Sequence, residues 1–221
     1  KFNASINAVE FGTGDKAVKI GGENVFPLYS FDAAIENAPK VGIEITDFGM
    51  EHEPECIKKY YEGCATLADM ARKAASMEGV DFLSFRMEGG DPNGANKSTE
   101  ELIGELKEIA DAVDLPLVVC GCKNVEKDAE LFSKAAEALN GKNAVILSAK
   151  EENYKTVGAA AGLAYKQVVG AESAVDINLA KQLNVLISQL GVDSKSVVMN
   201  VGTAAVGYGF EYVISTMDRV K

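Results

Sequence analysis

The sequence has few of the residues on which common catalytic and metal sites depend. It contains one histidine, His52, among 221 residues. A zinc site needs several histidine, cysteine or carboxylate ligands, and a serine–histidine–aspartate triad needs a placed serine; the surroundings of His52 supply neither set. His52 lies between Glu51 and Glu53, so we expect it on the surface, at an acidic approach to a helix.

The four cysteines match no common cluster-binding pattern. Cys56 and Cys64 are spaced C-x7-C, and Cys120 and Cys122 are spaced C-x-C. Neither spacing is typical of a zinc ribbon or a ferredoxin-type cluster. We favour reduced thiols in a reducing cytoplasm, with a metal or redox role left open. Cys120 ends an apolar run, so we expect it to point into the core.

Long apolar runs and positive charge are also scarce. No apolar run reaches the roughly 20 residues that a membrane-spanning helix needs, and no signal peptide is recognisable. The formal net charge is -11, from 22 Lys and Arg against 33 Asp and Glu. A nucleic-acid-binding protein needs a basic stripe, so we expect neither a nucleic-acid nor a membrane partner.

Nucleotide and Schiff-base signatures are missing as well. No G-x-x-x-x-G-K-[ST] motif occurs, and the glycines of residues 200–209 do not form G-x-G-x-x-G after a first strand. Lys123 and Lys150 follow apolar runs, but neither lies inside a run, where an aldolase-type lysine would be buried.

The sequence does contain a repeated unit: a short apolar run, a polar glycine-rich loop and an amphipathic stretch. This alternation predicts βαβ units and a parallel sheet, and its eightfold form is the TIM barrel. The unit occurs about six times, so we expect an α/β TIM-type barrel, apparently truncated after six units. Because an open parallel sheet exposes two edges, we expect the remainder to lie outside this chain, to be removed, or to come from another chain. The expected strands are 41–46, 80–87, 117–120, 144–148, 167–170 and 196–200.

Residues 1–39 follow a different pattern. The alternating runs 7–11 and 16–20 flank Gly12–Asp15 and predict a β-hairpin. We expect this segment to cover the barrel floor, and therefore divide the chain into an extension, 1–39, and a partial barrel, 40–221.

Helix starts are marked by proline and by capping patterns. Pro54 suits the first turn of one long helix over 54–77. Ser98-x-x-Glu101 reads as a capping box, and Ser148-x-x-Glu151 and Ser173-x-x-Asp176 resemble it. The remaining helices are expected to reach 139, 165, 189 and 220.

In a parallel barrel, the residues that follow the strands carry the chemistry. Here they are rich in Asp, Asn and Gly, which suit a large polar ring system better than acid–base hydrolysis. Each has an ordinary alternative in a turn or a helix cap, and the loop 86–96 has the alternative of a plain long turn. The candidate binding residues are Asp91, Asn93, Asn96, Asn153, Asp176, Asn178, Asn200, Gly202, Thr203 and Tyr208.

Several segments resemble one known family, in order and over nearly the whole chain. They are KAVKIGGENVF (16–26), MEGGDPNGANKS (87–98), LVVCGCKNVEKD (117–128), EENYK (151–155), DINLAKQLNVLI (176–187) and GYGFEYVISTMDR (207–219). The sequence is similar to the small subunit of the corrinoid iron–sulfur protein, called delta in CO dehydrogenase/acetyl-CoA synthase complexes.

The resemblance implies a barrel paired with a larger subunit that carries a [4Fe-4S] cluster and a corrinoid-binding domain. Cobalamin would lie between that domain and the barrel, and the ten candidates would bind corrin amides or the partner. The implied role is a methyl carrier, not a catalyst. Such a carrier receives a methyl group that a methyltetrahydrofolate methyltransferase takes from methyltetrahydropterin. It then delivers this methyl group to acetyl-CoA synthase/CO dehydrogenase. The chain agrees in offering no D-x-H-x-x-G motif and no cysteine quartet.

Two other functions stay open at this point. A pterin-dependent methyltransferase that binds methyltetrahydrofolate in its own barrel needs similar Asp and Asn residues at its strand ends. A purely structural barrel without a ligand is the other alternative.

Overall fold

The computed structural model describes residues 5–22 and 35–220. Within these residues, six parallel strands form one sheet, and each strand pairs with the next in the chain. The first and last strands of this sheet do not pair with each other, so the sheet is open, in the strand order of a barrel. The expected α/β fold with six βα units is confirmed. The strands are β3 (Gly42–Thr46), β4 (Phe82–Arg86), β5 (Leu117–Cys120), β6 (Val145–Ala149), β7 (Val168–Glu172) and β8 (Val197–Asn200).

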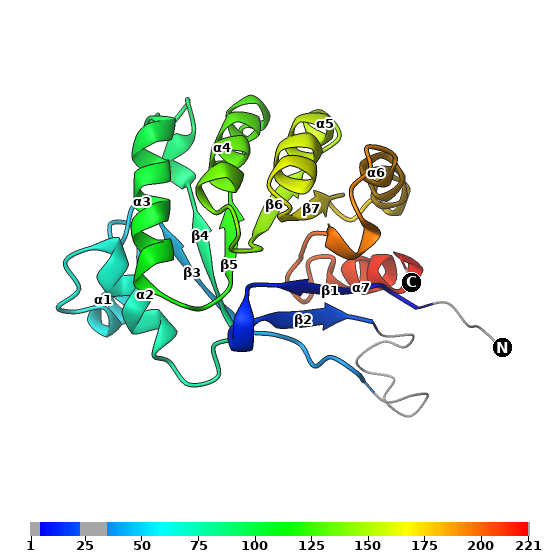
Figure 1. Cartoon of the computed structure of the whole chain (residues 1–221). Coiled ribbons are helices and arrows are strands. Elements are labelled where there is room, and N and C mark those ends of the chain that lie inside the picture. The colour runs from blue at the N-terminus through cyan, green and yellow to red at the C-terminus, as the bar shows by residue number, and fades with distance from the viewer. Residues whose placement is uncertain (1–4, 23–34, 221) are drawn as a thin grey trace.

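Helices follow the strands and cover one face of the sheet, which we call the outer face. Figure 1 shows α3 to α6 as an arc along this side. The helices are α1 (Glu55–Tyr60), α2 (Leu67–Ala75), α3 (Thr99–Ala112), α4 (Val125–Ala138), α5 (Tyr154–Val157), the π-helix η3 (Gly158–Ala164), α6 (Ile177–Gln189) and α7 (Phe210–Val220). Short 3-10 turns are η1 (Gly14–Lys16), η2 (Glu88–Gly90) and η4 (Ser194–Ser196).

The side chains of strands β4 to β8 alternate between two separate apolar clusters. Leu83 and Phe85 of β4 pack in the larger cluster, with helix residues such as Leu106 and Phe132. Val118 of β5 packs in the smaller cluster, on the opposite, inner face. Because side chains of a strand alternate with a period of two, the remaining strand residues can be placed on one face or the other.

The predicted N-terminal hairpin is present and packs on the inner face. Strands β1 (Ala8–Phe11) and β2 (Val18–Gly21) pair antiparallel. Val9, Phe11 and Val18 are buried against inner-face residues of the sheet. The Phe11 ring meets Phe82 edge to face, with 5.7 Å between the ring centroids.

Asn143, just before β6, fastens the hairpin to the sheet. The Gly12 N–H donates to the Asn143 carbonyl at 2.7 Å, and Asn143 Nδ2 donates to the Glu10 carbonyl at 3.0 Å. Residues 23–26, the end of the hairpin segment quoted above, lie outside the described residues. The division of the chain at residues 39 and 40 stays a prediction.

The predicted long helix 54–77 is wrong, because two helices occupy this segment. Gly63, with φ +87°, lies between α1 and α2, in a conformation that ends a helix. Thr66 then starts α2 in a capping box: its hydroxyl accepts the Asp69 N–H at 3.1 Å, and Asp69 Oδ2 accepts the Thr66 N–H at 3.1 Å. Pro54 is the residue before α1, not its first helical residue.

Two predicted helix starts are also wrong. Ser148 belongs to β6, and the next helix begins only after Asn153 and changes to a π-helix at Gly158. Asp176, not Ser173, caps α6, since its carboxylate accepts the N–H groups of Asn178 at 2.8 Å and Leu179 at 3.1 Å. Ser98 does cap α3, by accepting the Glu101 N–H at 3.1 Å.

Candidate functional site

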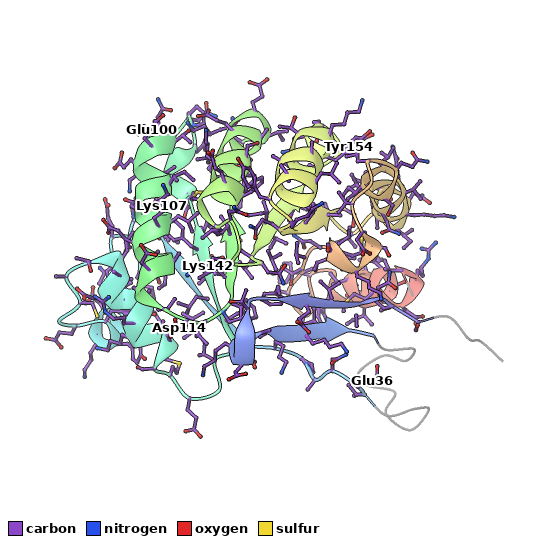
Figure 2. All side chains as sticks on the ribbon, in the orientation of Figure 1. Glu36, Glu100, Lys107, Asp114, Lys142 and Tyr154 are labelled. Carbon is purple, nitrogen blue, oxygen red and sulfur yellow. The ribbon has the colours of Figure 1, made fainter. Side chains whose placement is uncertain are left out.

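The loops that follow the strands lie at the end of the sheet away from the hairpin turn. In Figure 2, Glu100 and Tyr154, at the starts of α3 and α5, lie at this end. Asp114 and Lys142 lie nearer the hairpin, where they line a pocket with Gly12 and Thr13 of the hairpin turn. Within the described residues, the hairpin contacts Phe82 and Asn143, where strands β4 and β6 begin, and therefore lies at the amino end of the strands.

The inner face changes from apolar to polar toward this carboxyl end. Near the hairpin it carries residues such as Val118, Val145 and Val168. Beyond them the same alternation places six polar residues: Glu44, Ser84, Arg86, Cys120, Glu172 and Asn200. We call these six residues, together with Lys150 just after β6, the polar layer.

A bidentate ion pair between Arg86 and Glu44 forms one side of the polar layer. Arg86 Nε donates to Glu44 Oε1 at 2.9 Å, and Arg86 Nη2 donates to Glu44 Oε2 at 2.8 Å. Ser84 Oγ donates to the same carboxylate at 3.4 Å and lies 3.5 Å from Cys120 Sγ. This side therefore joins β3, β4 and β5 through side chains.

A second, looser ion pair lies on the other side of β5. Lys150 Nζ, just after β6, is 3.7 Å from Glu172 Oε1 at the end of β7. Asn200 Nδ2 of β8 donates to Ser148 Oγ of β6 at 3.0 Å. Side chains from all six strands or their ends thus lie at this level, in separate groups on the two sides of β5.

Cys120 lies on β5, between the strands that carry the two ion pairs. Burial raises the pKa of its thiol, with the Ser84 hydrogen bond and the charge of Arg86 acting to lower it. The carboxylates of Glu44 and Glu172 raise the same pKa. The thiol therefore stays protonated at neutral pH and is a poor nucleophile.

A buried aspartate, Asp47, holds the loop after β4. Its side chain is fully buried and accepts the Gly89 N–H with both oxygens, at 2.9 and 3.1 Å, and it lies 3.1 Å from Lys97 Nζ. Lys97 also binds Glu105 at 3.1 Å. Burial opposes the charge of Lys97, but its bonds to Glu105 and Asp47 outweigh burial and raise its pKa. Burial raises the pKa of Glu105.

Asp128 holds the loop after β5 in the same way. From α4, its carboxylate accepts the N–H groups of Cys122 at 2.7 Å and Lys123 at 3.1 Å, and the Cys122 thiol at 3.2 Å. Burial raises the pKa of Asp128. Asp47 and Asp128 thus fix the backbone of two loops at the carboxyl end.

The loops after β7 and β8 are tied to each other. Ala174 and Val175 have φ of 46° and 68°, a left-handed conformation that is rare for residues other than glycine. The Val175 N–H donates to the Val201 carbonyl at 2.7 Å. The Gly202 N–H donates to Asn200 Oδ1 at 3.1 Å. This strained turn packs Ala174 and Val175 against Gly202.

Several of the ten predicted binding residues are used by the loops themselves. Asp91 accepts the Asn93 N–H at 2.9 Å in a local turn. Asn153 is buried and binds Lys150 N and the Val125 carbonyl. Asp176 and Asn200 have the backbone bonds given above. For these residues the ordinary alternative of turn or cap accounts for the bonds that are present.

The other predicted residues are more accessible. Asn96, Asn178, Thr203 and Tyr208 are exposed, and their side chains make no hydrogen bond within the described residues. Tyr208 is 87% exposed, close to Val206 at 82% and Tyr212 at 66%. The loop after β8 and the first turn of α7 therefore present exposed apolar and aromatic side chains.

Sequence reasoning missed the charged strand residues of the polar layer. Glu44, Arg86 and Glu172 occupy inner positions in GIEIT, FLSFR and VVGAE, where alternation alone would have marked them. Glu172 was placed beyond the predicted strand end at 170, although β7 continues through it.

Neither a metal centre nor a membrane span is found in the described part of the chain. In residues 5–22 and 35–220, no group of three or more His, Cys, Asp or Glu side chains is arranged to hold a metal ion. Within the same ranges, no helix combines the length and the apolar character that crossing a membrane requires. His52 is exposed, as expected, and packs against Phe48.

Comparison with known proteins agrees with the segments quoted from the sequence. Residues 8–221 match the family model described as CO dehydrogenase/acetyl-CoA synthase delta subunit. The chain belongs to this family. The resemblance seen in the sequence is thereby confirmed, and the polar layer and its loops are features of a delta-family chain.

Curated relatives of this delta-family chain come from archaea. The acetyl-CoA decarbonylase/synthase complex subunit delta of Methanothermobacter thermautotrophicus is 31% identical over 223 residues, which are 100% of this chain and 57% of the relative. The subunit of the same name from Archaeoglobus fulgidus is 31% identical, over 95% of this chain and 47% of the relative. The chain thus spans about half the length of the curated relatives it matches.

One solved structure is similar in fold to the delta-family chain. It is Xanthomonas albilineans dihydropteroate synthase, with a TM-score of 0.49 and 15% identity, covering 82% of this chain and 66% of that chain.

Proposed function

We propose that this chain forms the barrel of a delta subunit that covers a corrinoid held mainly by a larger partner subunit. The observation that carries the proposal is the family match over residues 8–221. The names of the curated relatives place them in an acetyl-CoA decarbonylase/synthase complex. The partner would carry the corrinoid domain and the [4Fe-4S] cluster.

The residues at the carboxyl end suit a corrinoid in their chemistry. A corrinoid is a broad ring edged with primary amides, so its cover needs both hydrogen-bond donors and acceptors. The polar layer offers Arg86 and Lys150 as donors and Glu44 and Glu172 as acceptors. In the loop after β8, the exposed side chains of Tyr208 and Val206 offer apolar contact.

Each part of the chain has its own task in this proposal. Asp47 and Asp128 keep two loops rigid, and the exposed residues Asn96, Asn178 and Thr203 are retained as rim contacts for the ligand or the partner. When bound, the corrinoid supplies the cobalt that accepts and donates the methyl group. The chain orients the ring and limits access of water to it.

The proposal also includes the source and the destination of the methyl group. The methyl group would come from methyltetrahydrofolate through a separate methyltransferase and pass to acetyl-CoA synthase/CO dehydrogenase, in the cytoplasm.

The test is co-expression of this chain with the corrinoid-binding subunit of the same organism, grown with hydroxocobalamin. We expect the two to co-purify as a coloured complex that retains stoichiometric cobalt by elemental analysis, whereas the partner alone loses corrinoid on dialysis. Separate elution of the two chains, with cobalt retention by the partner unchanged, would contradict the proposal.

A titration of this chain alone with methyltetrahydrofolate separates the alternatives. Tight binding without the partner would favour a pterin-dependent methyltransferase. If this chain binds neither methyltetrahydrofolate nor cobalamin, whether it is alone or in complex with the partner, a structural barrel is favoured.

A further inference from the structure

The polar layer contains charges that cancel. Glu44 and Arg86 form one pair and Glu172 and Lys150 the other, in a protein whose formal net charge is -11. Charges on the inner face of a sheet lose part of their hydration, and a pair offsets this cost only partly. Pairing of opposite charges therefore makes this layer neutral as a whole, and a neutral layer favours neither a polyanion nor a polycation.

Both pairs keep hydrogen-bonding capacity that the described residues do not use. Arg86 has five N–H donors, of which two hold Glu44. Lys150 and Glu172 approach only to 3.7 Å and form no hydrogen bond with each other within the described residues. All four side chains are partly accessible, with exposed fractions of 27% for Arg86, 42% for Glu44, 27% for Lys150 and 33% for Glu172.

A cation beside a carboxylate matches one neutral group well. The carbonyl oxygen of a primary carboxamide accepts from the cation, and its NH₂ donates to the carboxylate. A carboxylate ligand would satisfy only the cation and would meet repulsion from the neighbouring glutamate. The layer therefore distinguishes an amide from the corresponding acid.

The two pairs lie on opposite sides of β5. Glu44 and Arg86 come from β3 and β4, and Lys150 and Glu172 come from the ends of β6 and β7. Arg86 is in register with Cys120 of β5, and Ser84, which donates to Glu44, lies 3.5 Å from Cys120 Sγ. Glu172 ends β7, two strands from β5 on its other side. A ligand that reaches both pairs needs a broad frame with more than one carboxamide.

We propose that the Glu44–Arg86 and Glu172–Lys150 pairs each bind a primary carboxamide of one broad, neutral ligand. This inference rests on the proposed function, under which that ligand is the amide-edged corrinoid. It assigns ligand specificity to strand residues of the polar layer and leaves the loop residues as secondary contacts.

The test compares cobalamin with its separate monocarboxylic acids, in each of which one carboxamide is hydrolysed. Binding to the complex of this chain with the corrinoid-binding subunit is measured by equilibrium dialysis and the absorbance of free corrinoid. We expect the wild-type complex to bind at least one of these acids roughly tenfold or more weakly than cobalamin, because a glutamate repels the new carboxylate.

Two variants identify the residues responsible. Glu44→Gln and Glu172→Gln keep the side-chain size but remove the negative charge, so we expect each to reduce the preference for cobalamin over one of the acids. Glu108→Gln, on the exposed surface of α3, is the control and should leave the preference unchanged. Because Glu44→Gln leaves Arg86 without its carboxylate, urea unfolding checks that each variant still folds; Glu172→Gln disturbs a looser pair.

The outcomes separate the two proposals. If the wild-type complex binds cobalamin and every acid equally, or if neither glutamine variant changes the preference, the carboxamide assignment is wrong while the corrinoid function stands. If the wild-type complex does not bind cobalamin at all, the proposed function itself fails.

Discussion

Two buried aspartates determine the shape of the loops at the carboxyl end. Asp47 binds the Gly89 N–H, and Asp128 binds the N–H groups of Cys122 and Lys123. In both cases the carboxylate packs against a glycine, Gly89 or Gly121, where a Cβ atom would overlap the carboxylate oxygens. Each aspartate therefore requires a residue without a side chain at that position.

Gly89→Ala should destabilise the protein by about 1–3 kcal/mol, as overpacking in a tight interior does. Asp47 has no room to move, because its side chain is fully buried and also bound to Lys97. The matched control is Gly94→Ala in the same loop, where the nearest atom to a Cβ is 3.6 Å away. Its effect should stay within about 0.5 kcal/mol in urea unfolding. Equal effects of the two substitutions would refute the role given to Asp47.

Cys122 makes the stability of the folded protein depend on pH in the alkaline range. Burial raises the pKa of its thiol from 9.0 to about 11, and the Asp128 carboxylate acts in the same direction. Between these values the folded thiol holds a proton that the unfolded thiol has lost. The native state then binds more protons, so stability falls as the pH rises through this window.

Cys122→Ser tests this dependence, since serine keeps a donor for Asp128 but does not titrate in this range. We expect the difference in unfolding free energy between wild type and variant to be constant below pH 9.0 and to shift against the wild type up to about pH 11. Urea unfolding at a series of pH values measures it. A difference that stays constant throughout would show that the thiol titrates normally.

Among the elements, the hairpin β1–β2 closes the inner face where the strands begin. Phe11 is 2% exposed and contacts Phe82, whereas Glu10, next to it in β1, is exposed. A hairpin alone is marginally stable, so its position depends on these apolar contacts.

Phe11→Ala should lower the free energy of unfolding by about 3–5 kcal/mol, the usual cost of removing a buried phenylalanine. Glu10→Ala should have little effect, because only the backbone of Glu10 bonds to Asn143. Urea unfolding of both variants measures the difference. A small effect of Phe11→Ala would mean that the hairpin contributes little to the fold.

The helices and strands differ in how well the sequence predicts them. Strands of the sheet were predicted close to their observed positions, because short apolar runs between polar loops have few alternatives in an α/β chain. The break between α1 and α2 was missed, although Gly63 and the Thr66–Asp69 pair are visible in the sequence. Apolar periodicity continued across this break and outweighed the local signals.

Over the whole molecule, the chain has an acidic exterior and a neutral polar layer. The formal net charge is -11, and exposed acidic side chains such as Glu100, Glu101 and Glu108 of α3 contribute to it. The polar layer pairs its charges instead. The net charge of the chain therefore does not indicate the charge of the ligand, whereas the paired charges of the polar layer favour a neutral one.

The sequence by itself determined the order of the strands and helices, the hairpin and the family, because these follow from apolar periodicity and from segments of contiguous residues. Only the tertiary structure decided which polar residues meet. Glu44, Arg86, Lys150 and Glu172 are far apart in the chain and come together only because parallel strands align their carboxyl ends. Asp91, Asn153 and Asp176 look equally available in the sequence, yet their side chains already form hydrogen bonds with the backbone.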